Sequence, residues 1–159
     1  MSDQPFVPAD FAVPDELTAG EFRLEPLGPG HNVADYAAWT TSIDHIQATP
    51  GFAGRGWPHE MSLAENLGDL ERHAQDFADR RGFTYTVLDT GTGDVIGCLY
   101  IYPPRGGDKD GGSAGDYDAS VSSWVRADRA ELDPVLYRTV RAWLEETWPF
   151  RSVKYAPRA

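Results

Sequence analysis

Two runs of β-forming residues joined by a short turn constrain this chain more than any other feature. The first run is FTYTVLD (83–89) and the second is DVIGCLYIYP (94–103). Both are rich in β-branched and aromatic residues, and the TGTG connection between them supplies the glycines that a tight turn needs. The sequence therefore predicts a β-hairpin built from these two segments.

Segments with helix or strand patterns flank the hairpin on both sides. Ser62 and Glu65 match the S-x-x-E capping box, and apolar residues recur at helical spacing behind them. These signals predict a helix over 63–81, with Gly82 at its C-cap. The other predicted elements are helices at 32–46 (N-cap Asn32) and 134–147 (N-cap Asp133), and strands at 21–27, 117–126 and 151–156.

Proline and glycine mark two segments as irregular. Residues 1–20 contain three prolines and are predicted to form an extended N-terminal arm, whose apolar side chains contact either the domain or a second copy in a homodimer. Residues 103–116 are rich in glycine and lack apolar anchors, which predicts a flexible loop. The length of 159 residues suggests that residues 21–159 form a single domain.

The charge of the chain argues against polyanionic partners. Acidic residues exceed basic ones, 25 − 14 = 11, which gives a formal net charge of −11. This charge disfavours nucleic acid and anionic membranes. No apolar run approaches the roughly 20 residues of a membrane span, and no signal-peptide pattern is present, so a cytoplasmic location is expected. The single cysteine, Cys98, excludes a thiolate metal cluster and is expected to be buried.

The segment 47–61 is a predicted loop that carries aromatic and imidazole side chains. Trp57 and His59 lie in it, and His45 precedes it. Such loops are often binding surfaces, although the aromatic residues also suit a role in plugging the core. The four histidines show no metal-ligand spacing, so no metal site is predicted.

The order of the elements, strand, helix, helix, hairpin, strand, helix and strand, resembles the GNAT superfamily of acyl-CoA-dependent N-acetyltransferases over residues 21–156. The resemblance is carried by FRLEPLGPGHNVADYAAW, FTYTVLDTGTGDVIGCLYIYP and ASVSSWVRADRAELDPVLYRTVRAWLEE. It implies an α+β fold with a mixed, mostly antiparallel sheet flanked by helices. It also implies a further helix and hairpin beyond residue 156, for which this chain is too short.

The resemblance implies where acetyl-CoA would bind. In the superfamily, the pantetheine lies along the backbone of the fourth strand, which here corresponds to Trp124, Val125 and Arg126. The pyrophosphate lies on the loop that follows, where Arg129 and Arg138 would be its counter-charges.

The sequence of this loop departs from the superfamily pattern. The usual Arg/Gln-x-x-Gly-x-Gly/Ala is replaced by RAELDP (129–134). Glu131 and Asp133 would repel phosphates, and Pro134 lacks an N–H donor.

Two functions remain open from the sequence. The first is the transfer of an acetyl group from acetyl-CoA to a small-molecule amine, with Asp118 as base and Tyr102 as proton donor. In that function His45, Trp57, His59 and Tyr85 are the candidate substrate contacts, and the two histidines are also candidate bases. The alternative is a non-catalytic relative that has lost acyl-CoA binding and holds a ligand or partner.

Overall fold

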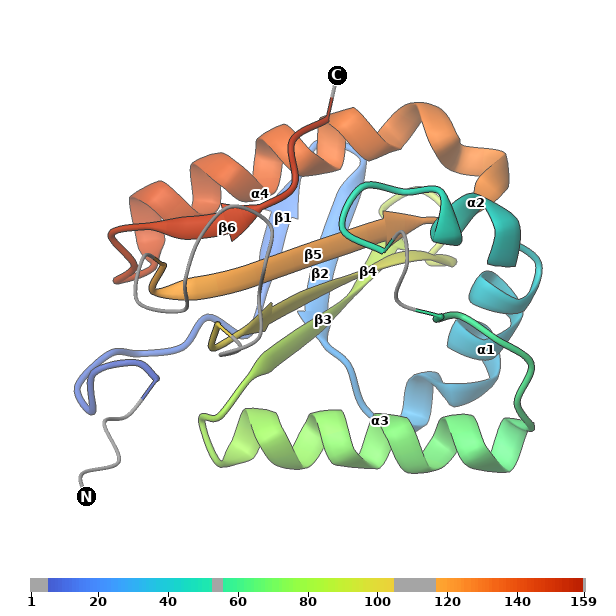
Figure 1. The fold of residues 1–159 in the computed structure, drawn as a ribbon, viewed down its shortest axis with the longest axis horizontal. Coiled ribbons are helices and arrows are strands. Elements are labelled where there is room, and N and C mark those ends of the chain that lie inside the picture. Colours follow the sequence, from blue (N-terminus) through green and yellow to red (C-terminus); the bar gives the residue numbers. More distant parts are fainter. Residues whose placement is uncertain (1–5, 53–55, 105–116, 159) are drawn as a thin grey trace.

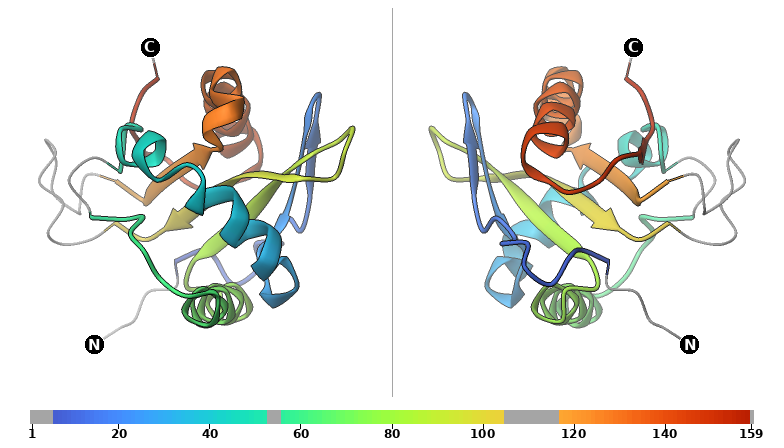
Figure 2. Two further views of the ribbon diagram at one scale, coloured as in Figure 1. Left: turned by 90° about the vertical axis from the view of Figure 1, so that its right-hand side faces the viewer. Right: turned by 90° about the vertical axis from the view of Figure 1, so that its left-hand side faces the viewer.

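The computed structural model describes residues 6–52, 56–104 and 117–158, which form a six-stranded sheet covered by helices (Figures 1 and 2). The strands are β1 (Leu17–Ala19), β2 (Phe22–Pro26), β3 (Phe83–Asp89), β4 (Val95–Tyr102), β5 (Ala119–Val125) and β6 (Val153–Tyr155). The helices are η1 (Pro29–His31), α1 (Asn32–Thr40), α2 (Ile43–Gln47), α3 (Leu63–Ala78), η3 (Ala127–Leu132) and α4 (Asp133–Thr147).

The strands lie in chain order across the sheet, from β1 to β6. Neighbouring strands are antiparallel except β5 and β6, which are parallel. This arrangement confirms the predicted α+β class and the mixed, mostly antiparallel sheet. The predicted hairpin is also confirmed, because β3 pairs with β4 along nearly its whole length.

Two apolar cores hold the layers together. One core contains the α4 residues Leu136, Val140 and Leu144 packed against the sheet. The other contains Trp39 from α1 and Leu70 from α3, together with Cys98, which is fully buried as predicted. No helix of the described residues is long and apolar enough to cross a membrane.

The segment predicted as one helix over 32–46 consists of two helices, α1 and α2, so this prediction is wrong. The break falls at Thr41 and Ser42, and the Thr41 hydroxyl donates back to the carbonyls of Ala37 and Ala38 at 3.0 and 3.1 Å. Such side-chain bonds compete with the continuing helix ladder. Asn32 is not an N-cap either, since its amide donates to the carbonyl of Leu63 at the start of α3.

The capping box of α3 is confirmed, but the predicted C-cap is wrong. Ser62 Oγ accepts from the Glu65 N–H at 3.0 Å, and Glu65 Oε1 accepts from the Ser62 N–H at 2.8 Å. The helix ends at Ala78, and Arg80 takes the left-handed conformation with φ of 61°. Gly82 has another role, because a Cβ at this position would overlap the ring of Tyr102.

The described part of the N-terminal arm packs on the body of the protein. Val7 is buried, and the ring of Phe6 stacks on Phe83 with centroids 5.8 Å apart. The Arg80 guanidinium donates to the carbonyls of Pro8 and Phe11 at 2.7 and 2.9 Å. The arm is not extended throughout, because the N–H of Phe11 donates to the carbonyl of Pro8 in a turn, and its last residues form β1, which pairs with β2. The predicted flexible loop at 103–116 lies, after Pro104, outside the described residues.

Candidate functional site

A cavity of about 620 Å³ lies between α1, α3, β4, β5 and the loop that precedes α3. This volume falls within the range of small-molecule sites. The side chains that line it are aromatic, acidic or small and polar, and they come from segments far apart in the chain. The lining includes Ser120 and Ser122 of β5, beside the rings and carboxylates described below.

Aromatic rings form one wall of the cavity. The rings of Trp57, Phe52 and Tyr100 pack against one another. Their centroids are 5.9 Å (Phe52–Trp57), 6.2 Å (Phe52–Tyr100) and 6.5 Å (Trp57–Tyr100) apart. Trp124 lies behind this wall, where its indole N–H donates to the Tyr100 hydroxyl at 3.0 Å. This hydrogen bond fixes the orientation of the Tyr100 ring in the wall.

Three carboxylates face the same cavity, from Asp35, Asp69 and Asp76. Among the described residues of the lining, the basic side chains are Arg72 and His73. Arg72 is 63% exposed and pairs with Asp69 at 2.7 Å. Burial lowers the pKa of His73, and the Arg72 charge lowers it further. With His73 neutral, the described residues of the lining carry a formal charge of 1 − 3 = −2.

Asp35 is the most buried of these carboxylates, with 4% exposure. Its Oδ2 accepts from Asn66 Nδ2 at 3.2 Å, and Asn66 is held in turn by Trp39 Nε1 at 3.1 Å and by Asn32 Oδ1 at 2.8 Å. Burial raises the pKa of Asp35 from 3.8 to about 6, against the lowering effect of the Asn66 bond. Holding an ionised carboxylate here costs folding free energy, which is typical of a functional position.

A hydrogen-bonded chain runs from Asp76 through Tyr102 to His73. The Tyr102 hydroxyl donates to Asp76 Oδ2 at 2.9 Å and lies 2.9 Å from His73 Nδ1. When the hydroxyl proton goes to the carboxylate, the Tyr102 oxygen can accept from a protonated Nδ1, and Thr84 Oγ1, 3.1 Å from Nδ1, is a second candidate acceptor. In this tautomer the Nε2 of the neutral imidazole carries a lone pair and can accept a proton.

The structure places two of the sequence-predicted catalytic or substrate residues, Tyr102 and Trp57, in the cavity lining. Tyr85 lies elsewhere in the core, where it is fully buried and donates to the carbonyl of Pro14 at 2.5 Å. His45 and His59 are also outside the lining. His59 is exposed, and His45 has a buried Nε2 without a hydrogen-bond partner in the described part of the chain.

Asp118 also lies outside the lining of the cavity. Its carboxylate accepts the backbone N–H groups of Arg151 and Ser152 at 2.6 and 3.3 Å. Its own N–H donates to the carbonyl of Ser152 at 2.7 Å. These bonds join the start of β5 to the turn before β6, which is a structural contact.

β6 ends at Tyr155, so within the described residues the end of β5 has no strand paired on this side, and we call this open edge of β5 the wedge. The pairing ends at Val121 and Tyr155, whereas β5 continues to Val125. The wedge thus lies beside Trp124 and Val125, the predicted edge for a pantetheine. Arg158, from the segment after β6, donates through Nη2 to the carbonyl of Ser123 at 2.8 Å.

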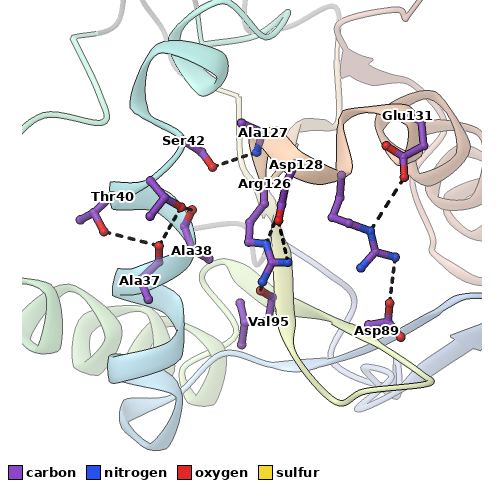
Figure 3. Close-up of polar contacts among 12 residues, drawn as sticks. Ala37, Ala38, Thr40, Ser42, Asp89, Val95, Arg126, Ala127, Asp128 and Glu131 are labelled. Carbon is purple, nitrogen blue, oxygen red and sulfur yellow. Dashed lines mark hydrogen bonds and ion pairs between the residues drawn. The ribbon is translucent and has the colours of Figure 1, made fainter.

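The loop after β5 has its polar groups engaged within the chain (Figure 3). The N–H of Arg126 donates to the carbonyl of Ile96 at 2.8 Å, and the N–H of Ala127 donates to Ser42 Oγ at 2.8 Å. The Arg126 guanidinium pairs with Asp128 at 2.9 Å and reaches the carbonyl of Val95 at 3.3 Å.

The two predicted phosphate contacts, Arg129 and Arg138, differ in their surroundings. Arg129 pairs with Asp89 at 2.8 Å on the β3–β4 hairpin, and Glu131 lies 3.9 Å from the same guanidinium. Arg138 is exposed on α4. Asp133 is the first residue of α4 and not its N-cap, and its carboxylate pairs with Arg158 at 2.6 Å.

These contacts do not fit the phosphates of acetyl-CoA. A phosphate cradle needs free N–H groups and a positive field, whereas this loop consists of two 3₁₀ turns that meet at a kink at Arg129, and the N–H groups of Arg126, Ala127 and Arg129 donate within the chain. Arg126 and Arg129 are paired with carboxylates, and Asp133 is at the helix start. Within the described residues, no group of three or more His, Cys, Asp or Glu side chains is arranged to hold a metal ion.

The fold is shared with solved N-acetyltransferases. The ribosomal-protein-S5-alanine acetyltransferase from Vibrio fischeri aligns with a TM-score of 0.57, 9% identity and coverage of 81% of this chain and 66% of that chain. RimL, a ribosomal L7/L12 α-N-protein acetyltransferase in complex with coenzyme A, aligns with a TM-score of 0.59, 11% identity and coverage of 80% and 63%.

A third solved structure is the microcin C7 self-immunity acetyltransferase MccE in complex with acetyl-CoA and AMP. It aligns with a TM-score of 0.55, 11% identity and coverage of 80% of this chain and 63% of that chain. The sequence matches no protein-family model and no curated protein sequence. The protein therefore has a divergent GNAT fold, as the sequence predicted, and it spans about two thirds of the length of these enzymes.

Proposed function

We propose that this protein binds a small organic amine, as its ammonium ion, in the cavity between α3 and the sheet. The observation that carries the proposal is the Asp35 carboxylate, which is 4% exposed yet lines a cavity walled by aromatic rings. An ammonium ion beside Asp35 would offset the cost of ionising this carboxylate away from water.

The aromatic wall supports the same class of ligand. An ammonium group is attracted to the faces of tryptophan and tyrosine rings within about 6 Å, most strongly where water is excluded. Trp57 and Tyr100 offer such rings in a lining whose described residues carry a formal charge of −2. Anionic ligands of similar size are disfavoured by that charge.

Isothermal titration calorimetry with phenethylammonium at pH 7.5 tests the proposal. Its matched ligand is 2-phenylethanol, which has the same shape without the charge. We expect saturable binding of the ammonium ion and binding at least about tenfold weaker for the alcohol, which corresponds to about 1.4 kcal/mol.

Substitutions locate the binding site. Asp35→Asn removes the charge but keeps an acceptor for Asn66, and we expect it to weaken binding of the ammonium ion by about tenfold or more. Asp44→Asn, at an exposed position in α2, is the matched control and should leave binding unchanged. Equal affinity for the ammonium ion and the alcohol, or unchanged affinity in Asp35→Asn, would contradict the proposal.

The fold comparisons favour a second candidate function, the transfer of an acetyl group from acetyl-CoA to this amine. The similar enzymes are acetyltransferases, and two of them were solved with coenzyme A or acetyl-CoA. The neutral imidazole of His73 is a candidate group in the cavity to accept a proton from an ammonium ion. The poor fit of the loop to phosphates argues against this candidate.

Release of the coenzyme A thiol, measured with a thiol-reactive dye, distinguishes the two candidates. The assay contains the protein, acetyl-CoA and a panel of phenethylamine, n-butylamine and putrescine. Amine-dependent thiol release that is lost in His73→Gln establishes the transferase. Binding of an amine without thiol release establishes the binding protein.

A further inference from the structure

The guanidinium of Arg158 is held on every side within the wedge between β5 and the segment that follows β6. Its side chain is 3% exposed. Nη2 donates to the carbonyl of Ser123 at 2.8 Å, Nη1 donates to the carbonyl of Ala156 at 2.7 Å, and Nε donates to Asp133 Oδ2 at 2.6 Å. One planar group thus connects β5, the start of α4 and its own segment.

Two tyrosines enclose the same guanidinium. The rings of Tyr137 and Tyr155 lie 5.7 and 5.8 Å from its central carbon and 4.6 Å from each other. The Tyr155 hydroxyl forms a 2.6 Å hydrogen bond with Ser123 Oγ. Stacking on aromatic faces and forked bonding to a carboxylate are the two interactions for which arginine is better suited than lysine.

Asp133 has a structural explanation in these contacts. Asp133 is the first residue of α4, the helix whose start would face the pyrophosphate in the family resemblance, and its carboxylate would repel that phosphate. Here the same carboxylate is 14% exposed and forms the ion pair that fixes Arg158. The acidic residue and the arginine 25 positions later therefore act as a pair.

We infer that Arg158 closes the wedge as a permanent part of the fold, with its side chain in the place that the family resemblance gives to the pantetheine. The Ser123 carbonyl, which an extended ligand would use on this edge of β5, already accepts from Arg158. The wedge is then a structural joint and not a cofactor site. This inference concerns a different region from the amine cavity and does not depend on it.

Thermal unfolding with and without 1 mM acetyl-CoA tests the inference. We expect no shift in wild-type Tm with acetyl-CoA and a fall in Tm on the order of 10 °C in Arg158→Ala, because Asp133 loses its partner in a mostly buried position. Arg158→Lys, which lacks the planar fork, should fall by an intermediate amount. Arg138→Ala, at an exposed position on α4, is the matched control and should change Tm by less than about 2 °C.

Two results would overturn the inference. The first is a rise in Tm with acetyl-CoA in the wild type, since a ligand stabilises the state that it binds. This result would show that the wedge is a cofactor site. The second is an Arg158→Ala or Arg158→Lys variant as stable as the wild type, which would show that the guanidinium is not part of the joint.

Discussion

The carboxylate of Asp35 accepts a hydrogen bond from the amide of Asn66 at 3.2 Å, and this pair joins α1 to α3 at the edge of the cavity. Asn66 also accepts from the indole of Trp39 at 3.1 Å, so both amide atoms are engaged. The pair therefore holds a buried acid in a fixed orientation toward the space where an amine would bind.

Asp35→Asn is expected to stabilise the protein at pH 7. Because burial raises the pKa of Asp35 to about 6 from 3.8, the folded state holds a proton between these values that the unfolded state releases. The free energy of unfolding thus falls as the pH rises through this window. The variant should be more stable than the wild type at pH 7, by up to ~3 kcal/mol, and not at pH 3.5. Urea unfolding at both pH values measures the difference, and a destabilised variant at pH 7 would exclude this assignment.

The stability contributed by His73 should decrease as the solution becomes more acidic. Burial lowers its pKa below 6.5, so below that pH the unfolded state binds a proton that the folded state does not. Arg72 adds to this lowering, whereas Asp69 and Asp76 oppose it. When the pH is lowered from 7.5 to 5.5, the Tm of the wild type should fall by more than the Tm of His73→Gln. Parallel pH profiles for the two proteins would contradict the prediction.

The tautomer of His73 is expected to depend on Tyr102. In the wild type, ¹⁵N NMR should show a protonated Nδ1 and an unprotonated Nε2, because the Tyr102 oxygen accepts from Nδ1 while its proton goes to Asp76. Tyr102→Phe removes the hydroxyl and should shift the population toward the other tautomer. It should also destabilise the fold by about 1–3 kcal/mol, because buried polar atoms lose a partner. An Nε2-protonated wild type would reject the proposed role as proton acceptor.

Two glycine-to-alanine substitutions should have opposite effects. A Cβ at Gly97 of β4 would approach the backbone carbonyl of Trp124 to 2.4 Å, which the paired strand cannot relieve by a rotamer change. We expect Gly97→Ala to destabilise by at least ~2 kcal/mol. Gly68→Ala, in α3 with nothing within 4 Å of the added methyl, should stabilise by about 0.5–1 kcal/mol. Thermal unfolding compares the pair, and equal effects would contradict the packing described for β4 and β5.

Much of the fold could be predicted because the sequence patterns that determine its helices and strands are local. The β-branched residues of 83–89 and 94–103, and the capping box at Ser62, act through neighbouring residues and appear where they were expected. The break between α1 and α2 was missed because it depends on whether hydroxyls at Thr41 and Ser42 bond to the chain or to solvent. Periodicity alone does not decide this.

The candidate site was only partly predictable. Tyr102 and Trp57 were found from their residue type and their positions on a strand and in a loop. Asp35, Asn66 and His73 were missed because each lies in a helix among other polar residues, where a solvent-facing position is the usual outcome. In the bonds Trp39–Asn66, Asp35–Asn66 and His73–Tyr102 the partners are 27 to 31 residues apart, so the packing of α1, α3 and β4 brings them together.

The central claim is that Asp35 pairs with an ammonium ion in the cavity, and the pKa of its carboxyl tests this most directly. The measurement is a ¹³C NMR titration of the Asp35 carboxyl with and without saturating phenethylammonium. Without the ligand, the pKa should be raised to about 6. With the ligand, the positive charge should stabilise the carboxylate and lower the pKa by about one unit or more. An unchanged or higher pKa in the presence of the ammonium ion would contradict the account.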